Sequence, residues 1–178
     1  YANNIKDIFI EVLDARQVIT VLAHAPHPDL SALKTFLLEN KNYEVNVEYM
    51  ADNPSANALS DMVIFHNLPS TKYSIEPFLT QMNKRRTPRI FITGQSTSLE
   101  ALNKAQDLVT INGTSGSFNE VQGTLKSNFS LFTLSDVLKN SIRNFPPLLA
   151  PFGEFKIGPS TQVLMEQRIG SIDTEYPL

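Results

Sequence analysis

The sequence predicts an α/β protein, a three-layer sandwich in which helices cover both faces of a mostly parallel sheet. Continuous apolar runs recur at residues 18–23, 62–66 and 89–93. Such short runs are typical of strands that are buried on both faces. The stretches between them carry apolar residues at helical spacing. This alternation of strand and helix is the pattern of a parallel sheet.

The first predicted element is a strand at residues 5–13, where apolar and polar side chains alternate loosely. We assign residues 1–16, this strand and a short linker, to a preceding domain or to an edge strand of the sheet. Residues 17–178 then form one α/β domain, because 178 residues is an ordinary length for a single domain. The chain begins with Tyr1 rather than Met, and we interpret it as a fragment of a longer protein.

Further along, strands are predicted at residues 18–23, 43–50 and 62–66, with a single helical turn at 56–61. The first helix begins at Pro28 or Asp29, because proline at the first helical position and an acidic first turn are both favourable. Its apolar stripe consists of Leu30, Leu33, Phe36 and Leu37.

Ser74 is predicted to cap the next helix, which ends with the basic residues 84–86. A strand at 89–93 ends at Gly94, and a helix follows at 98–105. These elements run in the general order of a flavodoxin-like fold.

The C-terminal part is predicted to add an antiparallel pair of strands, at 155–157 and 162–169, joined by a turn at 158–160. Before them we expect a strand at 108–111 and a flexible loop at 112–116. A helix opens at residues 133–136 and ends before Pro146, with three apolar side chains facing inward: Val137, Leu138 and Ile142. Residues 145–153, FPPLLAPFG, are interpreted as a core-lining loop or a docking surface.

Composition excludes several classes of function. The net charge is −3 and basic residues are scattered, so no nucleic-acid interface is expected. The absence of cysteine excludes thiol nucleophiles, thiolate metal ligands and disulfides. No apolar run approaches the roughly 18 residues that span a bilayer, so no membrane contact is expected from this chain. No glycine-rich phosphate loop stands between a strand and a helix, and no cofactor is expected.

The candidate catalytic residues lie where predicted strands end. His24 and His27 follow the first buried strand, His66 ends another, and Ser96 follows the strand at 89–93. Sites of parallel α/β sheets gather at this edge. The strand, sharp turn and helix around Ser96 have the form of a nucleophile elbow. One hypothesis is therefore a Ser-dependent hydrolase or acyltransferase, in which Ser96 is activated by His66 or His27.

The segment Pro26-His27-Pro28-Asp29 resembles the zinc motif of N-acetylglucosaminyl deacetylases. That resemblance implies a metal-dependent deacetylase in which His27 and Asp29 are candidate metal residues. In the deacetylase motif Asp and Glu come next, whereas Leu30 and Ser31 occupy those positions here. One metal-ligand carboxylate of the motif is missing, and no histidine follows His66 to supply the later histidine motif.

Residues 94–98, Gly-Gln-Ser-Thr-Ser, resemble the elbow Gly-x-Cys-x-Gly of class I glutamine amidotransferase-like domains. The resemblance implies the same α/β architecture, with Ser96 at the position of the catalytic cysteine. The late strand at 163–170 carries no histidine, although the family has its catalytic His-x-Glu after such a strand. Glutaminase activity is therefore not expected, and the leading hypothesis is a non-catalytic module with a structural or binding role.

The combination of residues 26–29, 145–157 and 169–178 is similar to a group of Bacteroidetes envelope proteins, in which amidotransferase-like domains lie inside larger membrane-anchored chains. This similarity implies an exported module on the periplasmic side of such a protein, with the cytoplasm as the alternative. Its partners would be other domains of the same chain or other envelope proteins.

Overall fold

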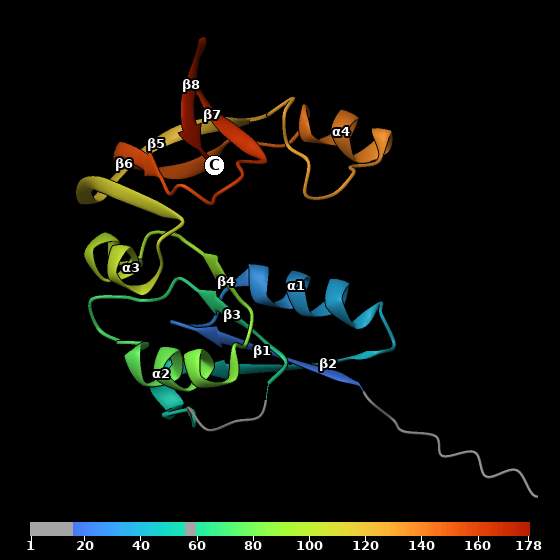
Figure 1. The fold of residues 1–178 in the computed structure, drawn as a ribbon, viewed down its shortest axis with the longest axis vertical. Helices are drawn as coiled ribbons and strands as arrows, with labels where there is room; N and C mark the ends of the chain where they lie inside the picture. The colour runs from blue at the N-terminus through green and yellow to red at the C-terminus, as the bar shows by residue number, and fades with distance from the viewer. Residues whose placement is uncertain (1–15, 56–59) are drawn as a thin grey trace, which may run out of the picture.

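A computed structural model of the chain describes residues 16–55 and 60–178. The strand predicted at 5–13 and most of the helical turn predicted at 56–61 lie outside these residues. The protein is α/β, with one parallel and one antiparallel sheet, each of four strands. Figure 1 shows the two sheets one above the other. We call residues 16–105 the parallel half and residues 109–178 the antiparallel half.

The parallel half is built on strands β1 (Gln17–Ala23), β2 (Tyr43–Tyr49), β3 (Met62–His66) and β4 (Arg89–Ile92). They lie in the order β2-β1-β3-β4 and all pair in parallel. The prediction of a parallel sheet is therefore confirmed for this half. The strand positions follow from the buried apolar runs, which had marked three of these four strands in the sequence.

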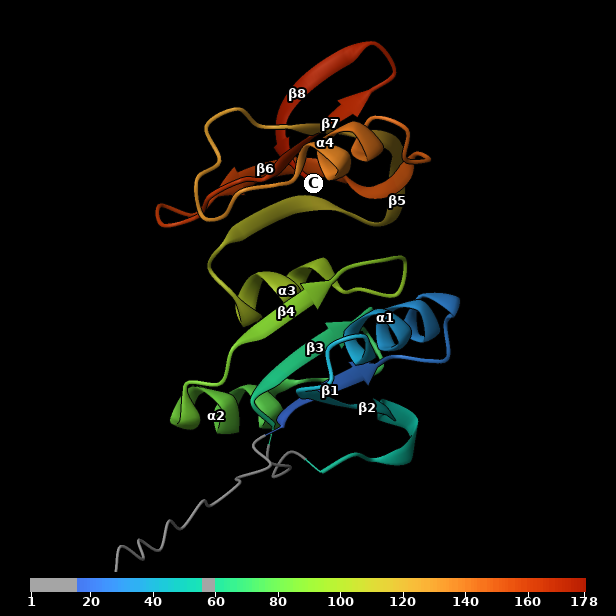
Figure 2. The same cartoon turned by 90° about the vertical axis from the view of Figure 1, so that its right-hand side faces the viewer.

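Helices cover both faces of this sheet. Alternate residues of β1 point to opposite sides: Val21 packs with Leu30 of α1 (Pro28–Leu38), and Leu22 packs with Phe78 of α2 (Glu76–Arg85). Figures 1 and 2 show α1 and α2 on opposite sides of the strands. A short 3-10 helix, η1 (Met50–Asp52), follows β2. The three-layer prediction is thus confirmed in the parallel half.

Two details of these helices differ from the prediction. Phe36 lies outside the apolar stripe of α1 and is 68% exposed, because the stripe of this helix needs only one side chain per turn to cover β1 and β2. Ser74 precedes α2, whose N-cap is Ile75, although the Ser74 hydroxyl accepts a hydrogen bond from the Glu76 amide at 3.3 Å.

The antiparallel half consists of β5 (Val109–Leu125), β6 (Leu148–Ile157), β7 (Met165–Ile169) and β8 (Ile172–Pro177), in the order β6-β5-β7-β8. The prediction of a joined antiparallel pair was wrong in its partners, since β6 and β7 flank the long strand β5 instead of pairing with each other. Residues 145–153 are not a loop, because most of them belong to β6.

The flexible loop predicted at residues 112–116 was also wrong. Asn112 and Gly113 pair with Glu154 and Gly153 inside the β5–β6 ladder, which is irregular between Gly113 and Phe118. A Cβ atom at Gly113 would lie 2.0 Å from the carbonyl oxygen of Phe152. Glycine is therefore required at position 113 by the close approach of two strands and does not mark a flexible segment.

Helix α4 (Asp136–Ile142) has little of its apolar surface buried. Ile142 is 6% exposed, whereas Val137 and Leu138, which were predicted to face inward, are 78% and 41% exposed. This part of the prediction was wrong because a helix of seven residues contacts the sheet mainly through its last turn.

Candidate functional site

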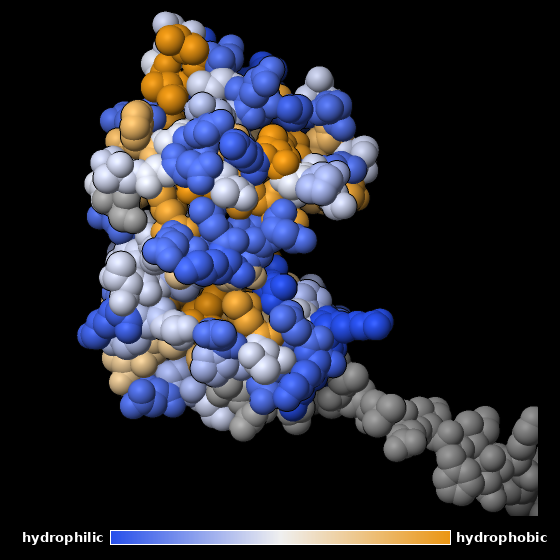
Figure 3. All heavy atoms as spheres, turned by 60° about the vertical axis from the view of Figure 1, so that its left-hand side comes forward, coloured by the Kyte–Doolittle hydropathy of each residue, from blue (hydrophilic) through white to orange (hydrophobic). Residues whose placement is uncertain are grey.

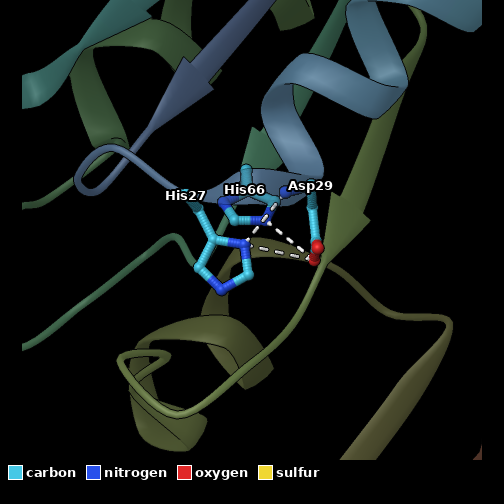
Figure 4. A group of neighbouring side chains, drawn as sticks. All are labelled: His27, Asp29 and His66. Atoms are coloured by element: carbon cyan, nitrogen blue, oxygen red, sulfur yellow. Dashed lines mark hydrogen bonds and ion pairs between the residues drawn. The ribbon is translucent and has the colours of Figure 1, made fainter.

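Three polar side chains meet at the edge of the parallel sheet where β1 and β3 end. These strands are neighbours, and Ala23 at the end of β1 is in register with His66 at the end of β3. His27 is the N-cap of α1, and Asp29 lies in the first turn of that helix. Figure 4 shows His27, Asp29 and His66 pointing toward one another. The register of β1 with β3 and the start of α1 together place His66 beside His27 and Asp29, although they lie 39 and 37 positions before it in the sequence.

Asp29 lies between the two imidazoles. Its Oδ2 atom is 3.3 Å from His27 Nδ1 and 3.8 Å from His66 Nε2. The two rings are tilted against each other with their centroids 5.1 Å apart. One nitrogen or oxygen atom from each of the three side chains lies within 4.8 Å of the others. Two imidazoles and a carboxylate this close can hold one metal ion.

Exposure differs sharply within this cluster. The side chains of His27 and Asp29 are 45% and 65% exposed, and that of His66 is 3% exposed. Burial lowers the pKa of His66, and the neighbouring His27 lowers it further, while Asp29 acts in the opposite direction. The Nδ1 atom of His66 is buried and has no hydrogen-bond partner among the described residues. His66 is therefore a neutral imidazole near pH 7.

His24, the third histidine, does not join this cluster. Its Nδ1 atom is 3.0 Å from the Ser70 hydroxyl, and its ring contacts Tyr73 edge-on at 5.3 Å between centroids. The His24 amide also donates to the carbonyl of His66. His24 therefore contributes to packing at this edge and is not a member of the cluster.

Ser96 lies in an ordinary tight turn. The Thr97 hydroxyl accepts from the Gly94 amide at 3.0 Å, and the Thr97 amide donates to the Gly94 carbonyl at 3.0 Å. Ser96 itself is exposed and does not have the positive φ of a strained turn residue. No hydrogen bond joins its hydroxyl to an imidazole within the part of the chain that the structure describes. The buried residue that closes the turn is Thr97, which no sequence signal had singled out.

The position at which the deacetylase motif carries its second aspartate is part of the core. Leu30 is 4% exposed and packs with the apolar side chains of β1 and β2. The third member of the cluster, His66, comes instead from a neighbouring strand. Its place beside His27 depends on strand order, because neighbouring parallel strands end at the same edge.

Comparisons with known proteins give no relative: no family model, no curated protein and no solved structure matches the chain. No helix in residues 16–55 and 60–178 is long and apolar enough to cross a membrane.

Proposed function

We propose that the chain is a non-catalytic, amidotransferase-like domain of a larger cell-envelope protein, exported to the periplasmic side, and that it binds other domains of that protein. The observation that carries this proposal is the turn after β4. It has the strand–turn–helix form of the family's elbow, but Ser96 has no positive φ, and no imidazole of the described residues is hydrogen-bonded to its hydroxyl. The strand order β2-β1-β3-β4 supports the proposal, since it agrees with the first part of the flavodoxin-like order.

The binding role is supported by the surface of the antiparallel half. Many large apolar side chains of this half are exposed by 40% or more, among them Phe132, Leu149 and Phe152. An open groove of about 1100 Å³ runs between β5, β7 and α4, with Phe129, Phe132 and Ile142 in its lining. Figure 3 shows apolar atoms reaching the surface at the far end of this half. Large apolar side chains that gather on an exposed surface are typical of interaction sites.

The lack of serine catalysis can be tested with a fluorophosphonate probe, which labels activated serine hydroxyls. We expect no labelling of the folded wild type, since no described imidazole or carboxylate is hydrogen-bonded to the Ser96 hydroxyl. A known serine hydrolase treated in parallel is the positive control. Labelling of the wild type that is lost in Ser96→Ala would overturn the proposal in favour of a Ser-dependent hydrolase.

The binding role can be tested by hydrogen exchange in the full-length gene product and in the chain alone. We expect residues 131–152 to exchange more slowly in the full-length protein, because other domains cover them there. Residues 62–66, buried in both forms, serve as the internal control. Equal exchange of residues 131–152 in the two forms would contradict the proposed binding surface.

A further inference from the structure

We propose that His27, Asp29 and His66 form a binding site for one divalent transition-metal ion, and that zinc is its occupant. This site lies at the edge of the parallel half, away from the exposed apolar surface of the antiparallel half. It is therefore additional to the binding role proposed above and can fail independently of it. Figure 4 shows that the three side chains approach from two elements, with His27 and Asp29 at the start of α1 and His66 at the end of β3.

The distances are close to those that a zinc ion requires. With zinc–ligand bonds of about 2.0–2.1 Å, neighbouring ligand atoms of a tetrahedral site lie roughly 3.3–3.5 Å apart. Asp29 Oδ2 is 3.3 Å from His27 Nδ1 and 3.8 Å from His66 Nε2. All three ligand atoms lie within 4.8 Å of one another. Rotation of the exposed side chains of His27 and Asp29 can close the site without moving β3.

Hydrogen bonding alone does not satisfy His27. Its Nδ1 atom lies 3.3 Å from the amide nitrogen of Asp29 and 3.3 Å from the carboxylate of the same residue. Without a proton, this nitrogen accepts from the amide but faces the carboxylate lone pairs. With a proton, it donates to the carboxylate but can no longer cap the helix. A cation bound to Nδ1 takes up the same lone pair in place of the amide hydrogen and is attracted to the carboxylate, so it removes the repulsion between the nitrogen and the carboxylate.

His66 supplies a ligand atom whose position is fixed. Its side chain is 3% exposed at the end of β3, so burial holds the ring in place. The Nε2 atom is the ring nitrogen that faces Asp29, at 3.8 Å from Oδ2, whereas the buried Nδ1 has no partner among the described residues and takes no part in the site. The ion is therefore expected to bind to Nε2 of this ring.

The donor set determines which ion fits. Two imidazole nitrogens and one carboxylate oxygen suit zinc, whereas magnesium and calcium prefer oxygen ligands alone. The exposure of His27 and Asp29 leaves the fourth position open to water or to a ligand atom. No further carboxylate belongs to the cluster in the described residues.

The test is isothermal titration of the metal-free protein with zinc chloride, for the wild type and two ligand variants. We expect one ion per wild-type chain. His27→Asn removes the imidazole but keeps an amide that can cap α1, and Asp29→Asn removes only the charge. Each variant is expected to bind zinc at least about 100-fold more weakly. Replacing a residue that only hydrogen-bonds to a metal ligand already lowers metal affinity roughly 10–100-fold. Both residues are exposed, and circular dichroism confirms that the variants fold.

His24→Gln is the matched control, because His24 lies at the same edge, contacts Ser70 and is not one of the three clustered residues. Its affinity is expected to equal that of the wild type. With Co²⁺ in place of zinc, the wild type is expected to show the visible absorption of a tetrahedral site, and Asp29→Asn is not. Unchanged affinity in both ligand variants, an equal loss in His24→Gln, or a preference for Mg²⁺ or Ca²⁺ would each overturn the proposal. None of these results bears on labelling of Ser96.

Discussion

The parallel and antiparallel halves bury apolar side chains to very different extents. Two core clusters, one on each face of the parallel sheet, contain fourteen buried residues that all belong to the parallel half. The described residues of the antiparallel half form no cluster of their own, and Ile111 is buried against α3 (Leu99–Ala105). Of the fifteen exposed large hydrophobic residues in the described chain, eleven lie at positions 131–178, and Phe36, Leu38 and Ile90 lie in the parallel half. The antiparallel half therefore exposes most of the apolar surface that is available for a partner.

The difference follows from how each sheet is covered. Helices α1 and α2 lie on opposite faces of the parallel sheet, so both faces are buried. The antiparallel sheet has only two short helices beside it in the described chain, α3 and α4, and antiparallel sheets tolerate one face open to solvent. Backbone pairing holds its strands together, and contact with α3 (Leu99–Ala105) attaches it to the rest of the molecule.

That attachment uses side-chain amides in place of strand pairing. The Asn103 side chain donates to the Ile111 carbonyl at 3.0 Å and accepts from the Ile111 amide at 2.9 Å. Gln106 does the same around Val109, where its amide donates at 2.6 Å and its carbonyl accepts from the Val109 amide at 3.0 Å. The first residues of β5 are thereby fixed to α3, and the two halves are coupled at this junction.

The largest effect is expected from emptying the core of the parallel half. Phe65 is 0% exposed and stacks on Phe91 with 5.2 Å between ring centroids. Phe65→Ala should lower the free energy of unfolding by about 3–5 kcal/mol, because it leaves a large cavity. Urea unfolding followed by circular dichroism measures this change.

Phe152→Ala is the matched control in the antiparallel half, since Phe152 is 55% exposed. An exposed side chain of this kind should change stability by no more than about 0.5 kcal/mol. If the two substitutions destabilise the isolated chain equally, Phe152 is buried in solution and the contrast between the halves is wrong.

The next largest effect is expected at the junction. Asn103→Ala leaves the amide and carbonyl of Ile111 without their partners, which should cost about 1–3 kcal/mol. Hydrogen exchange should show that residues 109–113 lose amide protection before the core strands of the parallel half lose theirs, because the junction opens first. Glu100→Gln, on the exposed side of the same helix, is the control and should change little. Uniform loss of protection across both halves would contradict a separate role for the junction.

A smaller effect is expected from the helix caps, one in each half. Ser98 accepts from the Ala101 amide at 3.4 Å and caps α3, and Ser135 accepts from the Leu138 amide at 3.2 Å and caps α4. Ser98→Ala should cost about 1 kcal/mol, the usual value for a cap. Ser135→Ala should cost less, because α4 is mostly exposed and its unfolding exposes little new surface. Thermal unfolding of the two variants compares them directly, and a larger loss in Ser135→Ala would show that α4 is better packed than the structure indicates.

The smallest effect is expected from pH, and it acts only on the parallel half. Burial lowers the pKa of His66 below the ordinary value of 6.5. At pH values between the lowered pKa of the folded chain and the ordinary pKa of the unfolded chain, the unfolded chain binds more protons. The contribution of His66 to stability is therefore complete above the ordinary pKa and is lost as the pH drops below it. Asp29 favours the charged ring and therefore makes this loss of stability smaller. Urea midpoints in the presence of a chelator should decrease with acidification in the wild type and less in His66→Gln; an equal decrease would exclude His66 as the cause.

Much of the parallel half was predictable from the sequence because its strands are buried on both faces. Residues 18–23 and 62–66 are apolar runs that have few other interpretations, and Pro28 with Asp29 marks the start of a helix. The antiparallel half was predicted less well for a physical reason. Its long strand β5 contains Gly113 and Gly116, which suggest a loop locally, while pairing with β6 decides the conformation.

The candidate site, too, was predictable from the sequence only in part. The sequence by itself determined that histidines would lie at the ends of strands and that His27 and Asp29 would open a helix, because these are local properties. It also suggested an elbow at Gly94 to Ser98, since a strand, glycine and helix follow one another there. Only the tertiary structure decided that His66, and not His24, joins the cluster around Asp29, and that no imidazole of the described residues is hydrogen-bonded to Ser96. Those outcomes depend on strand order and side-chain direction, which are set by packing between segments far apart in the chain.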